Sequence, residues 1–119
     1  MRSATQKKTG KDPEYLEWIR SLPCVVCVIA TGLTVSDWVM FIRNGEFTVR
    51  RKSEAAHVGS RGLSQKCPDR QVLPMCCRHH TIGANSHHVL GKKFWSHHNL
   101  DRAQLIADLQ AEYENQLRQ

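Results

Sequence analysis

The segment QVLPMCCRHH, residues 71–80, joins a short apolar run to a cluster of cysteines and histidines. Its first five residues favour a strand, because they are mostly apolar and end at a cysteine pair. Its last five favour the start of a helix, in which side chains three residues apart lie on one side. Cys76 and His79 have this spacing, so we expect them to share one face. Cys77 and His80 have the same spacing, which leaves the register open.

A second cysteine pair, Cys24-x2-Cys27, follows the first predicted helix. Paired cysteines at short spacing, without a secretion signal, are typical of metal ligands rather than disulfides. Two thiolates from this turn, together with Cys76 and His79, make the four-ligand set that closes a tetrahedral zinc site. In a chain of 119 residues the apolar core is thin, and a metal supplies folding free energy directly. The sequence therefore predicts structural zinc (Zn²⁺). The alternative is that the cysteines of the second segment are simply buried thiols.

Apolar periodicity and turn signals indicate a small α+β domain. A β-hairpin insertion is expected over residues 38–50, because Asn44-Gly45 is a strong hairpin turn signal between β-branched and aromatic residues. Asp101 is expected to cap the last helix. Strands are expected over residues 53–58 and 71–75, and helices over residues 12–22, 76–82, 91–98 and 101–118.

The charge is concentrated in the middle of the chain. The net charge is +6, and residues 39–93 hold ten lysines and arginines against three acidic residues. A basic centre of this kind favours a polyanionic partner such as DNA, although a solvated basic surface is the alternative. The candidates for phosphate contact are Arg43, Arg50, Arg51, Arg61, Lys66 and Arg70.

The ends of the chain bear on domain organisation and compartment. Residues 1–11 are polar and lysine-rich, and we expect a flexible basic arm before a single domain of residues 12–119. Because no apolar run is long enough for a membrane helix or a signal peptide, a cytoplasmic protein with no membrane contact is expected.

The seven histidines all lie between His57 and His98, far above ordinary usage. A structural zinc uses one of them and leaves His57, His80, His87 and His88 without that task. Their order is a strand histidine, a second strand and then helix histidines, which is the order of a ββα-metal unit. In such a unit the strand histidine deprotonates water, because its ordinary pKa lies near neutrality. The helix histidines hold a divalent cation, which stabilises charge on a phosphate and its departing oxygen.

Four segments together resemble the HNH, or His-Me finger, endonucleases of phages and prophages, most closely the recombination-enhancement nucleases. They cover roughly residues 20–100, and their ordered combination is more specific than any one of them. The segments are LPCVVC (22–27), EAAHV (54–58), SQKCPDRQVLPMCCRHH (64–80) and HHVLGKKFW (87–95).

The resemblance implies a role for each matching residue. His57 is similar to the family's general base, and Cys24, Cys27, Cys76 and His79 to its structural zinc ligands. The helix-borne ligands of a catalytic Mg²⁺ or other divalent cation are similar to His80 and His88, with His87 as the alternative to His88. The implied function is metal-dependent hydrolysis of DNA phosphodiester bonds in a bacterial or phage-encoded protein.

The chain also departs from the family pattern. The residue before the first histidine, often a metal ligand, is Ala56, and the central asparagine of HNH corresponds to Gln71. Either Gln71 or the nearby Asp69 could orient His57, while Asp69 or Glu54 could instead complete the metal shell. The interval between His80 and His88 is longer than usual.

Two other functions compete with the nuclease. A zinc-stabilised DNA-binding accessory protein of phage recombination or packaging, without catalysis, explains the charge and the cysteines but leaves the surplus histidines idle. A protein-binding zinc finger makes the basic surface incidental. Oligomeric state stays open, because the last helix could pack on its own core or pair with a second copy as a homodimer.

Overall fold

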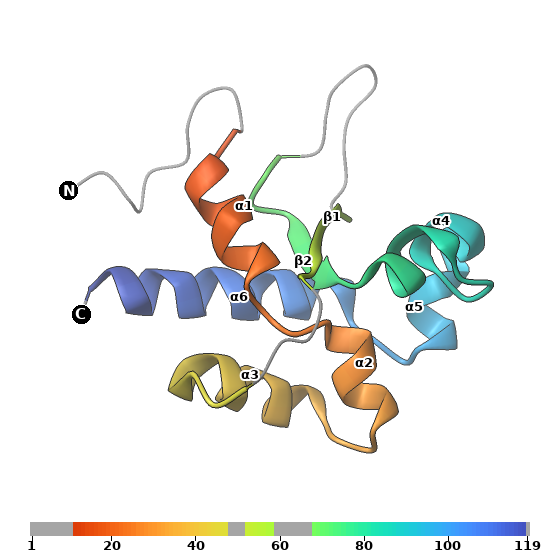
Figure 1. The fold of residues 1–119 in the computed structure, drawn as a ribbon, viewed down its shortest axis with the longest axis horizontal. Coiled ribbons are helices and arrows are strands. Elements are labelled where there is room, and N and C mark those ends of the chain that lie inside the picture. The colour runs from red at the N-terminus through yellow and green to blue at the C-terminus, as the bar shows by residue number, and fades with distance from the viewer. Residues whose placement is uncertain (1–10, 48–51, 59–67, 119) are drawn as a thin grey trace.

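A two-stranded antiparallel sheet lies at the centre of the protein, between helices (Figure 1). The computed structural model describes residues 11–47, 52–58 and 68–118. Strand β1 (Glu54–His57) pairs with β2 (Val72–Met75), and Glu54 stands opposite Met75 while His57 stands opposite Val72. Every residue of β2 is buried, which explains its continuous apolar sequence.

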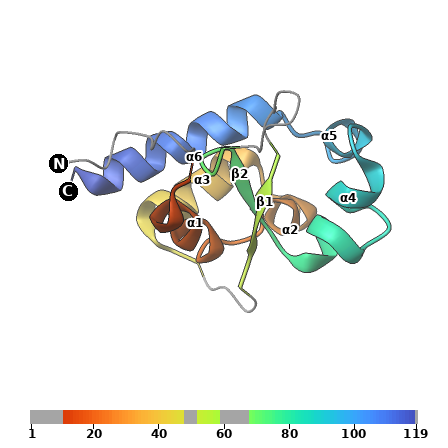
Figure 2. The same ribbon diagram turned by 90° about the horizontal axis from the view of Figure 1, so that it is seen from above.

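Helices surround this sheet on several sides. The longest, α6 (Arg102–Leu117), runs along the length of the molecule and packs against β2 and α3 (Val35–Asn44), and α1 (Pro13–Arg20) packs against both strands (Figures 1 and 2). Helix α2 (Val25–Ala30) joins α1 to α3 and contacts β2. Three short helices lie together at the end of the molecule away from the C-terminus of α6 (Figure 1). They are η1 (Arg78–Ile82), α4 (His87–Leu90) and α5 (Lys93–His97).

The core is formed where α1, the sheet and α6 meet. Tyr15 and Ile19 of α1 are fully buried, and the ring of Tyr15 packs edge-to-face on Tyr113 of α6 at 4.9 Å between centroids. Trp38 of α3 and Phe94 of α5 are also fully buried. The α+β class predicted from the sequence is thus confirmed.

The predicted hairpin over residues 38–50 is wrong where the structure describes it, because residues 35–44 form helix α3. Thr34 and Asp37 make a complete capping box at its start. Gly45 adopts a left-handed φ of 67° at its end, and the backbone N–H of Glu46 donates to the carbonyl of Phe41. Asn-Gly therefore ends a helix here by the left-handed C-cap rather than turning a hairpin. Residues 48–51 lie outside the described part.

The other predicted elements are placed close to their expected positions. Asp12 caps α1 by accepting from the backbone N–H of Tyr15, and Asp101 caps α6 by accepting from that of Gln104. The helix expected over residues 91–98 is the shorter α5, because Gly91 has a positive φ of 57° and separates it from α4. Within the described residues, no helix has both the length and the apolar character needed to cross a membrane.

Candidate metal centre and active site

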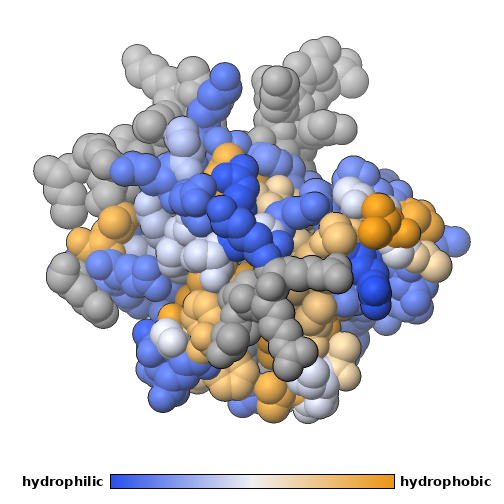
Figure 3. All heavy atoms as spheres, in the orientation of Figure 1, coloured by the Kyte–Doolittle hydropathy of each residue, from blue (hydrophilic) through white to orange (hydrophobic). Residues whose placement is uncertain are grey.

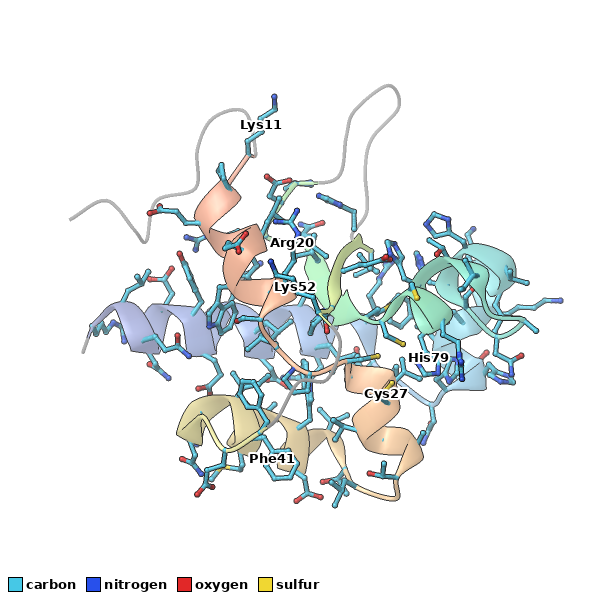
Figure 4. All side chains as sticks on the ribbon, viewed as in Figure 1. Lys11, Arg20, Cys27, Phe41, Lys52 and His79 are labelled. Carbon is cyan, nitrogen blue, oxygen red and sulfur yellow. The ribbon has the colours of Figure 1, made fainter. Side chains whose placement is uncertain are left out.

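Four side chains from two distant segments converge beside the sheet. Cys24 and Cys27 lie at the start of α2, and Cys76 and His79 lie at the entry to η1. Figure 4 shows Cys27 and His79 facing one another from these two elements. Their three sulfur atoms and a ring nitrogen of the histidine all lie within 4.8 Å of one another.

The separations match those of a tetrahedral zinc site. Zinc–sulfur bonds of about 2.3 Å and a zinc–nitrogen bond of about 2.0 Å place sulfurs about 3.8 Å apart and sulfur and nitrogen about 3.5 Å apart. Here Cys27 Sγ lies 3.7 Å from Cys76 Sγ. His79 Nδ1 lies 3.6, 3.5 and 3.3 Å from the sulfurs of Cys24, Cys27 and Cys76. The group could hold zinc, with all four positions filled by protein.

The structure also chooses between the two registers left open by the sequence. Cys76 and His79 join the cluster, whereas Cys77 and His80 do not. The reason is the start of η1, which turns the His80 side chain to the opposite side, toward β1. Of this second pair, His80 lines the neighbouring cavity, while Cys77 belongs to neither site.

The thiols of the cluster differ in acidity. The hydrogen bond with Cys27 and burial together raise the pKa of Cys24 to about 12, and the same hydrogen bond lowers the pKa of Cys27 below its ordinary value. Two sulfurs that share a proton behave as a coupled pair. Zinc would displace this proton, so its binding weakens as the pH falls.

A cavity of about 560 Å³ opens on the other side of η1. It is formed between the end of β1, the short helices and the start of α6. Four histidines take part in its walls. The lining residues are Ala55, His57, Val58, His80, His87, His88, Gly91, Lys92, Trp95 and Arg102.

His57 is held by an acidic partner. Its Nε2 lies 3.0 Å from Asp69 Oδ1, and the backbone N–H of Asp12 donates to Asp69 Oδ2 at 2.7 Å. Burial acts to raise the pKa of Asp69, but the hydrogen bonds from His57 and Asp12 outweigh it and hold the pKa below its ordinary value. A carboxylate only accepts hydrogen bonds, so in neutral His57 the proton sits on Nε2 and Nδ1 keeps its lone pair.

His80 has an acidic partner of its own. Its Nδ1 lies 2.7 Å from Glu54 Oε1, and its ring meets that of His88 edge-to-face at 4.9 Å between centroids. By the same reasoning, Nδ1 of His80 carries the proton and Nε2 keeps a lone pair. Glu54 thus supports a histidine, as carboxylates commonly do behind metal-binding imidazoles.

His87 is packed into the wall against the rings of Phe94 and Trp95. Its Nδ1 is buried, with no hydrogen-bond partner among the described residues. Burial, followed by the nearby His88 and His80, lowers the pKa of His87 below its ordinary value. We therefore assign His87 to the wall of the cavity and keep His88, which is exposed, as the candidate ligand.

Sequence reasoning missed two cations of the cavity. Lys92 lines it from the turn before α5, and Arg102 lines it from the first turn of α6, where Nη1 donates to the carbonyl of Val58 at 3.2 Å. Arg102 follows the Asp101 cap, so its position at a helix start was visible. Its proximity to His57 was not, because 44 residues separate it from Val58.

The predicted DNA contacts fare unevenly. Arg70 is buried and bonded to the carboxylates of Asp12 and Glu114, each at 2.8 Å, so the prediction of a phosphate contact is corrected to a core ion pair. Arg43 is half-exposed and pairs with Glu112 at 2.7 Å. Gln71 was a candidate to orient His57 rather than a DNA contact; it is half-buried, its backbone carbonyl accepts from the backbone N–H of Val58, and His57 pairs with Asp69 instead. The four others lie outside the described residues: Arg50, Arg51, Arg61 and Lys66.

Comparisons of the chain with protein-family models, with curated proteins and with solved structures found no match. The functional argument therefore depends on the two sites themselves.

Proposed function

We propose that this protein is a metal-dependent DNA endonuclease of the HNH, or ββα-metal, type, stapled by a structural zinc. The observation that carries the proposal is the cavity in which His57, with its Asp69 partner, faces the same space as His80 and His88. A purely structural zinc module has no need of this second histidine set. The arrangement follows the order strand, strand, helix that the sequence predicts.

His57 would act as the general base. The Asp69 carboxylate fixes the proton on Nε2, which leaves the lone pair of Nδ1 to take a proton from water. The resulting hydroxide attacks phosphorus in line, the bond to the leaving oxygen breaks, and the charge on His57 is offset by Asp69. His57 is 41% exposed, so water reaches it.

His80 and His88 would hold the divalent cation. Two observations fit: Glu54 keeps the proton of His80 on Nδ1, and the two rings lie 4.9 Å apart. When bound, such an ion stabilises negative charge on the phosphate and the leaving oxygen. Two protein ligands leave several positions open for water and substrate, unlike the closed cysteine site.

Arg102 and Lys92 would bind the phosphate in the cavity. The Arg102 guanidinium has five N–H donors, and the bond to Val58 uses one of them while fixing its orientation. Cations placed before the reaction stabilise the charge that develops on the phosphate oxygens. These residues replace Arg70 as candidates for phosphate contact.

A zinc-stabilised DNA-binding protein without catalysis is the second candidate. One observation favours it: among the described residues, only the Cys3His group brings three or more metal donors within 4.8 Å of one another. The histidines of the cavity would then be wall residues. Binding without cleavage is what this candidate predicts.

Relaxation of supercoiled plasmid separates the two candidates. The purified protein is incubated with Mg²⁺ or Mn²⁺, beside His57→Ala and an EDTA control. His97→Ala is the matched control, because His97 is an exposed histidine of α5 outside the cavity. The nuclease proposal expects metal-dependent cleavage that His57→Ala abolishes and His97→Ala leaves unchanged.

Zinc content and thermal unfolding of each variant show whether it is folded. Cleavage by folded His57→Ala at the wild-type rate would remove the proposed base. If neither the wild type nor any variant cuts DNA and all of them retard its migration in a gel equally, the DNA-binding candidate is supported.

A further inference from the structure

Two aliphatic side chains beside the cavity are exposed to solvent. Ile82, at the end of η1, is 74% exposed, and Val89, in α4, is 61% exposed. Neither belongs to the core or packs against it, although the neighbouring Leu90 does. Figure 3 shows apolar atoms on the surface at this end of the molecule, among strongly hydrophilic ones.

The two helices that carry these side chains form one unit. Helices η1 and α4 pack against each other, and the rings of His80 and His88 are in contact across them. Ile82 therefore lies two residues from one candidate metal ligand, and Val89 directly follows the other. Each is therefore close in the chain to a histidine that lines the cavity, although neither side chain lines it.

The turn after Ile82 is fixed by hydrogen bonds. The backbone N–H of Gly83 donates to the carbonyl of Arg78 at 2.9 Å, and Ser86 Oγ donates to the carbonyl of Thr81 at 3.1 Å. A Cβ on Gly83 would collide with the Arg78 carbonyl, so this close approach needs glycine. The backbone that carries Ile82 is thus fixed before a partner binds, which lowers the entropic cost of binding.

The elements that carry the pair, together with the neighbouring α5 and the start of α6, are basic, which favours a polyanionic partner. The described residues from 77 to 102 contain four cations, Arg78, Lys92, Lys93 and Arg102, against one acid, Asp101. A basic surface that also exposes aliphatic side chains is complementary to a polyanion that has apolar surface between its charges. Duplex DNA has this chemistry, because base pairs lie between two rows of phosphates.

We propose that Ile82 and Val89 form an apolar wedge that enters the minor groove of duplex DNA and unstacks a base step beside the cleaved phosphodiester. Aliphatic side chains inserted in this way kink the duplex and open it toward the protein. The location of the wedge relative to the cut depends on the proposed function, but the wedge itself requires only DNA binding.

The test uses the full chain carrying His57→Ala, so that the DNA stays intact. Its ligand is a duplex of about 30 base pairs with a donor and an acceptor dye at its ends, because a kink shortens the distance between them. The test variant adds Ile82→Ser and Val89→Ser. The matched control adds Leu33→Ser and Met40→Ser, which are also exposed aliphatic residues, at 39% and 44%, but near α3.

The wedge predicts that the test variant binds about tenfold more weakly or worse and no longer raises the energy transfer, while the control binds and bends DNA like its parent. The slope of log Kd against log salt stays unchanged, because no cation is removed. Equal bending by the test variant overturns the proposal, as does a parent that binds no DNA. Sedimentation of the same samples tests the remaining alternative, a protein interface. If the parent is a dimer, the test variant is a monomer and both bend DNA equally, the patch is a dimer interface and not a wedge.

The two proposals fail separately. If the protein with His57 intact does not cut DNA with any divalent cation, the nuclease fails, but loss of bending in the test variant still supports the wedge. If it cuts DNA and the test variant bends DNA like its His57→Ala parent, the nuclease stands without a wedge.

Discussion

At the scale of single residues, the proposed chemistry depends most on the contact between His57 and Asp69. The sequence left Gln71 or Asp69 to orient His57, and Asp69 or Glu54 to complete the metal shell. The structure pairs Asp69 with His57 and Glu54 with His80, and both carboxylates face the nitrogen that must keep its proton. A sequence pattern could supply these residue types but not the pairing, because residues 57 and 69 meet only after the strands align.

Asp69→Asn is expected to reduce cleavage by about 100-fold, because an amide can bond either tautomer and carries no charge to offset protonated His57. The rate of plasmid relaxation at saturating metal measures this. Asp108→Asn is the matched control, since Asp108 is an acidic residue of α6 outside the cavity. A rate like that of wild type would contradict the role of Asp69.

The lowered pKa of Asp69 also predicts a pH dependence of stability. A carboxyl whose folded pKa lies below its unfolded value stabilises the fold above the unfolded value, near pH 4, and loses this contribution as the pH falls through the folded pKa. The difference in unfolding free energy between wild type and Asp69→Asn should therefore shrink on acidification below about pH 4. Urea unfolding of both proteins at matched pH values measures this difference. Zinc release in acid lowers the stability of both proteins alike, so it does not contribute to the difference.

The neighbouring cysteines give a second prediction at this scale. Cys76→Ala should lose bound zinc and unfold at a much lower temperature, because three ligands hold the ion poorly and structural zinc contributes about 10 kcal/mol or more of apparent binding free energy. Cys77→Ala, one position away and outside the cluster, should keep one zinc per chain. Zinc release by a chromogenic chelator and thermal unfolding distinguish the two. Equal zinc content in both variants would return the register to an open question.

At the scale of elements, α3 shows where local sequence reasoning went wrong. Asn44-Gly45 favours a left-handed backbone conformation, which both a hairpin turn and the end of a helix require. What distinguished the two was the start of the segment, where Thr34 and Asp37 form a capping box, and the helical spacing of Val35, Trp38 and Ile42. The strands were predictable from their short apolar runs, and the last helix from its Asp101 cap and its apolar stripe.

The caps of α3 can be tested directly. Thr34→Ala should lower the free energy of unfolding by about 1 kcal/mol through loss of the cap, and Gly45→Ala by a similar amount, because alanine tolerates φ of 67° poorly. Ser36→Ala, at an exposed position inside the same helix, should change it by less than about 0.5 kcal/mol. Urea unfolding measures all three. A hairpin would show no cost for Thr34→Ala.

At the scale of the whole molecule, positive charge serves two different purposes. Arg70 joins the first turn of α1 to α6 through Asp12 and Glu114, and its guanidinium lies over the rings of Tyr15 and Tyr113 at 5.3 and 5.2 Å. The same Asp12 donates its backbone N–H to Asp69, so the ion pair is linked to the candidate base His57 through two hydrogen bonds. Net charge counted along the sequence could not separate this internal arginine from those that face a partner.

Two arginine substitutions separate these purposes. Arg70→Met should lower the free energy of unfolding by about 3–5 kcal/mol, because it leaves the buried Asp12 carboxylate unpaired, while a folded fraction should bind DNA with the wild-type salt dependence. Arg102→Gln should lower the free energy of unfolding by only about 1 kcal/mol, because it weakens one hydrogen bond to the Val58 carbonyl, but it should slow cleavage by about 100-fold, since the positive charge on the phosphate is lost. Arg118→Gln, an exposed arginine just beyond the far end of α6, is the matched control and should change neither quantity. If Arg102→Gln destabilised the fold as Arg70→Met does and lost activity only in proportion, its assignment to the phosphate would be wrong.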